Sequence, residues 1–419
     1  MKKQLERPSF VLFLKIFFAV ILLVRIILMF QPSFKIDMGD WQAWAGRLVE
    51  VGPFSFYSAN FFADYFPFFY FFLFILAKIF ALIFGKAAIF SLGFEIYIKV
   101  ISNIFDILTS VVIYKIINKH SEKWAFLGSI LYLLNPSVIF NSSIWGQIDA
   151  IPTFLLTFSL YQLEEKKNIA GSLITSVLSF LIKPLNVALY PLMLFRIIKN
   201  YSIRKIAIAG GLSILVFFIV TVPFFPKDPI FGAFKHLSNS LNVYPYTSLN
   251  AYNFWSLFGW WKEDSLQMFY LSYHLWGYIL FFLIVLIIFI PILRKKSKSF
   301  SKLDYLIYTI LSFAFFLFLT RIHERHLFPV FSLLIISASV LKSKLLLGVY
   351  FLLSLISFLN LFYSYYYYNF VYSNLSLANN IIYVVSLNYQ LFFSVLSLIL
   401  FGIMFYVYYK NQKLIYEKK

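Results

Sequence analysis

The sequence has no cysteine among its 419 residues, so disulfide bonds and thiolate chemistry are excluded. Charged residues are scarce at 13%, whereas hydrophobic residues make up 61% of the chain. Soluble globular domains are closer to half apolar, so a soluble protein is also excluded. The apolar residues form continuous runs and do not alternate, which excludes an outer-membrane barrel. The composition therefore predicts an all-α polytopic membrane protein.

Long polar stretches are missing as well, which predicts a single integral membrane domain over residues 1–419. The first apolar run, Pro8 to Phe30, is too long for a signal-peptide core and has no small-residue cleavage site after it. We therefore expect an uncleaved first helix.

Lysine and arginine crowd into seven short stretches, which the positive-inside rule assigns to the cytoplasm. They are residues 1–7, 115–123, 164–167, 196–205, 294–302, 342–344 and 410–419. The net charge of +19 is therefore an orientation signal and not a nucleic-acid footprint. The pattern predicts a multi-pass cell-membrane protein with both termini cytoplasmic and about twelve crossings.

The alternation of sides predicts that one apolar run does not span. Two runs separate the outer end of the first helix, at Gln31, from the basic stretch 115–123, where only one crossing fits. Run 66–84 is strongly aromatic and no basic cluster follows it, so we expect it to lie in or dip into the outer interface, within a first outer loop 31–95. Run 169–195 has basic clusters at both ends and should turn back near Lys183-Pro184. A second long outer loop, 226–267, is expected to cover a lipid-facing cleft.

Acidic residues in the first outer loop are candidates for chemistry. Asp37 and Asp40 lie directly after the first helix, beside Trp41 and Trp44. We expect a loop there, in which a carboxylate serves as general base for a hydroxyl substrate, with Asp37 as a substrate ligand. The alternative is a solvated loop acid, with Asp40 capping a helix that starts at Trp41.

A second polar segment falls in a tight turn between two apolar runs. Trp145, Gln147 and Asp149 together offer an aromatic platform, an amide and a carboxylate, which suit binding of a sugar ring. Alternatively, Asp149 caps the following helix, with Pro152 in its first turn.

The third segment concentrates cations on the outer side. It contains Arg321, His323, Glu324, Arg325 and His326 between apolar runs. Arginine binds phosphate oxygens in a bidentate manner and histidine can donate one more hydrogen bond, so the segment predicts a phosphate site, with Glu324 as a substrate ligand. The alternative is a purely structural helix end.

Two further polar features lie within apolar runs. Lys183 is either a fourth cation of the site or a snorkelling lysine at a proline break. Lys99, Asn103 and Asp106 share one helical face and predict an internal polar contact.

In this order the segments resemble the GT-C superfamily of membrane glycosyltransferases, in the branch that uses polyprenyl-phosphate sugars as donors. The resemblance covers most of the chain and is nearer to prokaryotic glucosyl- and mannosyltransferases. It rests on Gly39-Asp40-Trp41, Asp64-Tyr-Phe-Pro67, Asn135-Pro136, Trp145-Gly-Gln-Ile-Asp149, Ile182-Lys183-Pro184 with Tyr190-Pro191, Asn250 to Trp255, and Arg321-Ile-His323-Glu324-Arg325.

The resemblance implies a fold of about twelve transmembrane helices with a juxtamembrane helix in the first outer loop. It implies inverting transfer of a hexose from a polyprenyl-phosphate donor to a hydroxyl of a lipid-linked or envelope acceptor, glycan or protein, at the outer face. Asp40 would be the catalytic base, and His323, Arg325 and Arg321 would contact the donor phosphate. Neither metal nor other cofactor is implied. Competing functions are a transporter or flippase for lipid-linked sugars and a surface-polysaccharide polymerase or ligase.

Overall fold

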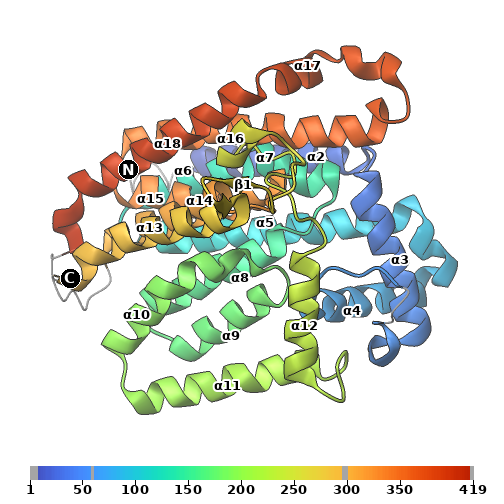
Figure 1. The fold of residues 1–419 in the computed structure, drawn as a ribbon, viewed down its shortest axis with the longest axis horizontal. Coiled ribbons are helices and arrows are strands. Elements are labelled where there is room, and N and C mark those ends of the chain that lie inside the picture. The colour runs from blue at the N-terminus through green and yellow to red at the C-terminus, as the bar shows by residue number, and fades with distance from the viewer. Residues whose placement is uncertain (1–7, 58–60, 295–300, 416–419) are drawn as a thin grey trace.

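The computed structural model describes residues 8–57, 61–294 and 301–415, which are almost entirely helical (Figure 1). The α-helices are α2 Pro8–Met29, α3 Lys35–Val51, α4 Pro67–Phe84, α5 Leu92–Asn118, α6 Glu122–Leu133, α7 Pro136–Ile139, α8 Ala150–Leu160, α9 Ile169–Phe180, α10 Tyr190–Asn200, α11 Ile203–Thr221, α12 Pro229–Leu241, α13 Tyr273–Arg294, α14 Lys302–Phe318, α15 Phe328–Val340, α16 Lys344–Tyr366, α17 Ile381–Asn388 and α18 Gln390–Lys410. The predicted all-α class is confirmed.

Short turns connect these helices. The 3-10 and π-helical turns are η1 Pro53–Ser55, η2 Lys86–Phe90, η3 Phe140–Trp145, η4 Tyr161–Lys166, η5 Pro184–Leu189, η6 Phe254–Phe258, η7 Glu324–Leu327, η8 Tyr367–Val371, η9 Leu375–Asn379 and η10 Gln412–Ile415. Two strands, β1 Gln267–Met268 and β2 Leu271–Ser272, form a small antiparallel hairpin before α13.

Six of the described helices are long and apolar enough to cross a membrane, or seven if α6 with the α7–η3 segment counts as one bent span. They are α4, α5, α11, α13, α16 extended through η8, and α18. Only 17% of the apolar window of α11 and 22% of that of α13 is buried, and such large exposed apolar faces are stable against lipid but not against water. A membrane-embedded protein follows. The described residues do not contain twelve full-length spans, because other apolar runs fold as shorter or broken helices.

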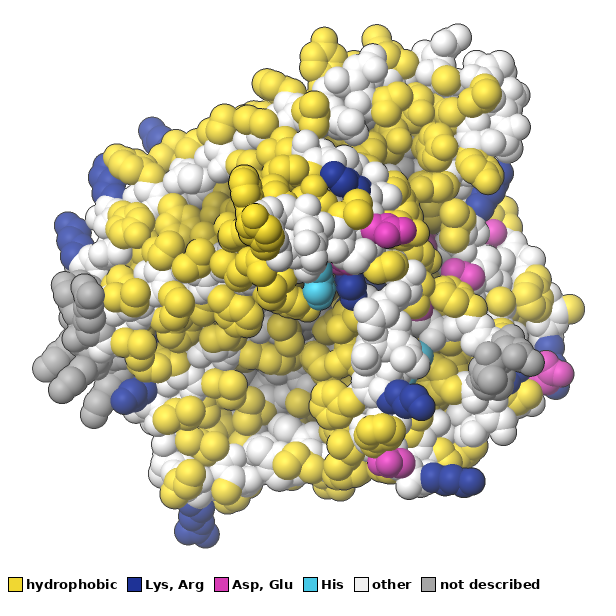
Figure 2. All heavy atoms as spheres, viewed as in Figure 1, with side chains coloured by type: hydrophobic (Ala, Val, Ile, Leu, Met, Phe, Trp, Pro, Cys, Tyr) yellow, Lys and Arg dark blue, Asp and Glu magenta, His cyan; other side chains and the backbone are white. Residues whose placement is uncertain are grey.

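Charge is distributed unevenly over the molecule. On the face in Figure 2, the left end carries Lys and Arg side chains without acidic ones, whereas Asp and Glu lie at the centre and right. Two ion pairs form in or next to the stretches that the charge pattern assigns to the cytoplasm; Asp304 lies two residues beyond stretch 294–302. Lys119 pairs with Glu165 at 2.8 Å, and Arg196 pairs with Asp304 at 2.7 Å.

Helix α3 corrects the prediction for the first outer loop. It begins at Lys35, so Asp37 and Asp40 lie on a helix, and the expectation of a loop with a helix starting at Trp41 was wrong. The N-cap, Phe34, makes no side-chain cap. Instead its N–H donates to the carbonyl of Trp145 at 3.0 Å, and the two rings stack at 4.2 Å. A tertiary contact therefore starts this helix, and no local cap signal marks it.

The aromatic run 66–84 forms α4, an unbroken helix with Pro67 in its first turn. Its start is tied to the α9–η5 connection, because Phe68 N–H donates to the carbonyl of Leu181 at 3.0 Å. Its middle is tied to α3, because Lys78 Nζ donates to the carbonyl of Val49 at 3.1 Å. Helices α3 and α4 thus pack as a pair beside the remaining bundle (Figure 1).

The predicted break at Lys183-Pro184 is confirmed. Helix α9 ends at Phe180, η5 follows, and α10 begins at Tyr190. Proline disfavours helical geometry in the residue before it, and Lys183 is extended, with φ −147° and ψ 130°. The lysine side chain therefore projects from an interruption between two helices.

A buried ion pair ties α2 to α5 and α6. Arg25 donates to Asp106 at 2.8 Å, to Asn103 at 2.7 Å and to the carbonyl of Leu133 at 2.8 Å. The predicted internal contact of the α5 polar face is confirmed. Lys99, one turn earlier, donates to the carbonyls of Met29 and Gln31, which end α2.

Removing one partner of this pair should destabilise the fold more than removing both. Asp106→Leu leaves the Arg25 guanidinium buried without its carboxylate, and such a change costs roughly 3–5 kcal/mol. The double variant Arg25→Leu, Asp106→Leu removes the uncompensated charge and should recover part of that loss. The check is the thermal unfolding midpoint in detergent. A double variant less stable than Asp106→Leu alone would contradict this explanation.

Candidate functional site

The carboxylate of Asp37 joins α3 to the turn that follows η3. Trp145 Nε1 donates to Asp37 Oδ2 at 2.8 Å, and Gln147 Nε2 donates to the same oxygen at 2.7 Å. The turn between these donors requires Gly146, whose φ of 83° is in the left-handed region. Asp37 and the pair Trp145 and Gln147, predicted as substrate ligands in two different segments, therefore bind each other. Trp145 and Gln147 are buried, so they hold Asp37 in place.

Lys183 reaches the same cluster from the break between α9 and η5. Its ammonium forms an ion pair with Asp149 and lies 3.3 Å from Gln147 Oε1, which also accepts a hydrogen bond from Tyr65 Oη at 3.3 Å. Asp149 is the N-cap residue of α8 but makes no side-chain cap, so its carboxylate is committed to the lysine. Of the two alternatives for Lys183, the structure favours a cation of the site.

Arg325, on η7, brings a second cation to the cluster. Its guanidinium lies 3.8 Å from Asp37 Oδ1, 3.2 Å from Glu324 Oε1 and 3.3 Å from His323 Nδ1. It also lies 5.9 Å from the centre of the Trp145 ring, within cation–π range. Arg325 Nε and Glu324 Oε2 are shielded from solvent and have no hydrogen-bond partner in the described part of the chain.

The connection 226–267, predicted as a long outer loop, fixes the backbone of the cationic segment. Leu249 N–H donates to the carbonyl of Ile322 at 3.0 Å, and Arg321 N–H donates to the carbonyl of Tyr246 at 2.8 Å. Within the segment, His323 N–H donates to His326 Nδ1 at 3.3 Å. These bonds fix a segment that has little regular structure of its own.

Arg321 has a different environment from Arg325. Its Nε donates to Asp264 Oδ2 at 2.7 Å, and its Nη1 donates to Asn242 Oδ1 at 2.7 Å. Although burial opposes it, hydrogen bonds from His274, Arg321 and Thr320 hold the pKa of Asp264 below its usual range. Arg321 borders the site with its charge already balanced, so its contact with a phosphate stays a prediction.

Three carboxyl groups in or near the cluster have raised pKa values. Burial raises the pKa of Glu324 to about 7, although the charge of Arg325 opposes the rise. Burial, followed by the charges of Asp64 and Asp37, raises the pKa of Asp40 to about 6. Burial also raises the pKa of Asp64 to about 6, although the charge of Arg325 opposes the rise. Asp40 makes no hydrogen bond or ion pair with other described residues, so its carboxylate is available to a substrate.

Basic and acidic groups of the site border a cavity of about 340 Å³. Its polar wall includes Asp64, Lys183, Arg321, His323, Arg325 and His326. Its apolar wall includes Phe180, Val187, Leu237, Leu241, Phe315 and Leu319. The cavity therefore offers cations to an anionic group and apolar side chains to a hydrocarbon chain. Figure 2 shows basic, acidic and histidine side chains gathered near the centre of one face, within an apolar surround.

Some of the residues predicted for the site line the cavity, and others lie outside its lining. The predicted phosphate ligands Lys183, Arg321, His323 and Arg325 all line the cavity. Outside the lining lie Asp40 and the predicted substrate ligands, which are Asp37, Trp145, Gln147, Asp149 and Glu324. Some of these ligands contact Lys183 or Arg325, which do line the cavity. Direct contact of these residues with substrate stays a prediction.

Some cavity residues had no predicted role. Asp64 was part of the Asp64-Tyr-Phe-Pro67 motif, and His326 was part of the cationic segment, but neither had a role of its own. Asp264, the partner of Arg321, lies 57 residues before it, and no local pattern links them.

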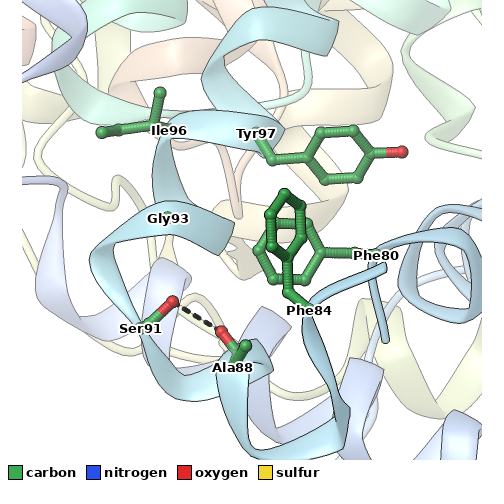
Figure 3. Close-up of a pocket in the computed structure, with 7 residues that line it drawn as sticks. All are labelled: Phe80, Phe84, Ala88, Ser91, Gly93, Ile96 and Tyr97. Atoms are coloured by element: carbon green, nitrogen blue, oxygen red, sulfur yellow. Dashed lines mark hydrogen bonds between the residues drawn. The ribbon is translucent and has the colours of Figure 1, made fainter. Parts of the chain in front are cut away.

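A second cavity, of about 360 Å³, lies between α4, η2 and α5. Figure 3 shows that Phe80, Phe84 and Tyr97 point into it, and the only hydrogen bond drawn there joins Ser91 Oγ to the carbonyl of Ala88 at 2.6 Å. It has no charged residue in its lining, so it does not supply the groups that polar chemistry needs.

Comparison with protein-family models and with curated protein sequences finds no match to this chain. Within the described residues, no group of three or more His, Cys, Asp or Glu side chains is placed to hold a metal ion.

Gly146 gives a test of the cluster's geometry. Gly146→Ala should destabilise the protein by roughly 1–2 kcal/mol, because a side chain is unfavourable at a positive φ. In addition, a Cβ there would lie 2.9 Å from Met38 Cε. The control is Gly210→Ala in α11, where nothing lies within 4 Å and helix propensity favours alanine. Thermal unfolding in detergent is the measurement, and equal midpoints for the two variants would argue against a required turn.

Proposed function

We propose that this protein is an inverting glycosyltransferase that moves a hexose from a polyprenyl-phosphate donor to an acceptor hydroxyl. The observation that carries the proposal is the cavity, whose lining combines apolar side chains with three cations, of which Lys183 is buried and Arg325 is mostly shielded, and two of the histidines near them. A polyprenyl-phosphate sugar has the same division, with a hydrocarbon chain next to an anionic phosphate. The motif order that resembles GT-C glycosyltransferases supports the same reading.

The phosphate would bind between Arg325 and Lys183. Arg325 has a buried Nε without a partner, which a phosphate oxygen would satisfy. Burial, together with the charge of Arg325, holds the pKa of His323 well below its usual value, so this imidazole is neutral near pH 7. The two cations therefore supply the positive charge, and His323 supplies a neutral hydrogen bond. In the low dielectric of a buried site these charges stabilise the leaving phosphate strongly.

In the proposed chemical step, Asp40 is the base. The acceptor hydroxyl oxygen attacks the anomeric carbon as the bond from that carbon to the phosphate oxygen breaks. The bonding electrons leave with polyprenyl phosphate, and Asp40 takes the hydroxyl proton. The configuration at the anomeric carbon inverts, because attack and departure occur on opposite faces. Asp40 follows Asp37 by one helical turn, so the framework that holds Asp37 also places the base.

The topology that we propose keeps the site on the outer side, with both termini in the cytoplasm and about twelve crossings, some by short or broken helices. Ion pairs in or next to the stretches assigned to the cytoplasm support this topology. So do the contacts among residues that it places on the outer side, which are those of Gln31, Lys99, Trp145 and Lys183. Helix α4 starts beside Leu181 and is followed by η2, which packs on α3. Both of its ends therefore favour the outer interface over a crossing.

The acceptor in this proposal is a hydroxyl of a lipid-linked or envelope glycan or protein. A transporter of the lipid-linked sugar would leave the donor's sugar–phosphate bond intact. A polymerase or ligase of surface polysaccharide would join whole chains. Mass spectrometry of envelope glycolipids and glycoproteins from a deletion strain separates these functions, because loss of the transferase removes one sugar residue from the product.

Asp40→Asn should abolish transfer of labelled sugar from a polyprenyl-phosphate donor while the protein accumulates in the membrane normally. The amide has the shape of the carboxylate but cannot take up the proton. The matched control is Asp228→Asn, an exposed acid that caps α12 and is replaced by another good cap. Turnover by Asp40→Asn equal to that of the control would remove Asp40 from the base role.

Transfer should also depend on pH with an acid limb near the raised pKa of Asp40. The carboxylate accepts a proton only when ionised, so kcat/KM should be full above about pH 7 and fall as pH decreases through about 6. Asp64 titrates in the same range and interacts with Asp40, so the limb belongs to the coupled pair. A profile that is flat from pH 5 to pH 8 would be inconsistent with a buried carboxylate base.

A further inference from the structure

Asp64 is held in place by contacts on both sides of its loop. The next residue, Tyr65, donates its N–H to Tyr70 Oη at 3.0 Å, and its carbonyl accepts from His236 Nε2 of α12 at 2.8 Å. Phe68 N–H, at the start of α4, bonds to Leu181. The backbone around Asp64 is therefore fixed by α4, α12 and the α9–η5 connection.

In this arrangement one oxygen of the Asp64 carboxylate has no hydrogen-bond donor within the part of the chain that the structure describes. Its Oδ1 is shielded from solvent and accepts no hydrogen bond from the described residues. No Lys, Arg or His nitrogen of the described residues lies within ion-pair distance of it. A buried acceptor without a donor is costly, and native proteins rarely keep one without a reason. The chemistry of the group calls for a ligand that donates hydrogen bonds.

The location of Asp64 in the cavity determines which part of a ligand can donate a hydrogen bond to it. Asp64 lines the same cavity as Arg325 and Lys183, the cations that would hold the donor phosphate. A phosphate diester offers acceptors only and would repel the carboxylate, so it cannot be the partner. The hydrocarbon chain has no donor. A sugar ring attached to the phosphate carries several hydroxyls, which are the donors that a carboxylate needs.

We propose that Asp64 binds a hydroxyl of the donor's hexose and thereby selects and positions that sugar. This inference rests on the proposed function and adds to it a residue that recognises the sugar. The roles of the two acids then differ. Asp40 receives the acceptor's proton, whereas Asp64 contacts a hydroxyl that stays on the sugar throughout the reaction.

The test uses short-chain polyprenyl-phosphate glucose and mannose and, for the better donor, its deoxy analogues, each lacking one hydroxyl. For the full sugar, Asp64→Asn should raise KM by roughly 100-fold or more, because a site built around a hydroxyl discriminates strongly when the pairing is lost. For one deoxy analogue the wild type and Asp64→Asn should become nearly equal, since the contact is absent in both. Asp228→Asn is the matched control and should resemble the wild type with every donor.

A second readout tests the inference apart from turnover. Native mass spectrometry in detergent measures binding of polyprenyl phosphate with and without its sugar. Asp64→Asn should bind the bare polyprenyl phosphate at least as tightly as the wild type, because the variant removes a negative charge from the cavity, and this also shows that the variant is folded. It should bind the sugar-bearing form more weakly.

The outcomes separate the two proposals. An equal loss by Asp64→Asn with every donor and every deoxy analogue, or unchanged binding of the sugar-bearing lipid, would overturn the role of Asp64 and leave the transferase in place. Absence of transfer by the wild-type protein from every donor would overturn the proposed function and, with it, this inference.

Discussion

Asp37 is the hydrogen-bond acceptor on which the geometry of the site depends. One of its oxygens receives hydrogen bonds from Trp145 and Gln147, more than 100 residues away in the sequence, and the other faces Arg325. A carboxylate at this depth is stable only with such partners, because an unsatisfied buried charge is strongly unfavourable. The requirement holds α3, the turn after η3 and the η7 segment in one arrangement. Asp40, one turn further along α3, is placed by the same constraint.

The electrostatic balance around this framework explains how the cavity can take an anion. Lys183 is paired with Asp149, and Arg325 with Glu324 and more distantly with Asp37, so the cations are stable in the protein alone. Arg325 still has one free donor toward the site, and Asp64 has one free acceptor. In the proposed function, the donor is satisfied by a phosphate oxygen and the acceptor by a sugar hydroxyl, since Arg325 and Asp64 line one cavity together with apolar side chains.

Much of this arrangement could be predicted from the sequence, and the failures have physical causes. Charge clusters and apolar runs predicted the class and the break at Lys183-Pro184, since proline and lysine act locally. The start of α3 at Lys35 was missed, because a tertiary contact of Phe34 with Trp145 replaces the usual cap. Arg321 and Arg325 looked equivalent, and only the fold brings Asp264 to the first of them. Asp64 was given no role, because only the three-dimensional structure shows that its buried oxygen has no hydrogen-bond partner among the described residues.

The central claim is that the cavity binds the phosphate of a polyprenyl lipid between Arg325 and Lys183. A cryo-electron microscopy structure with a short-chain polyprenyl phosphate tests it most directly. The account predicts phosphate density within hydrogen-bonding distance of the Arg325 guanidinium and the Lys183 ammonium, with the chain along Phe180 and Leu319. Phosphate density away from both cations, or a chain seated instead in the cavity of Phe80 and Tyr97, would contradict it.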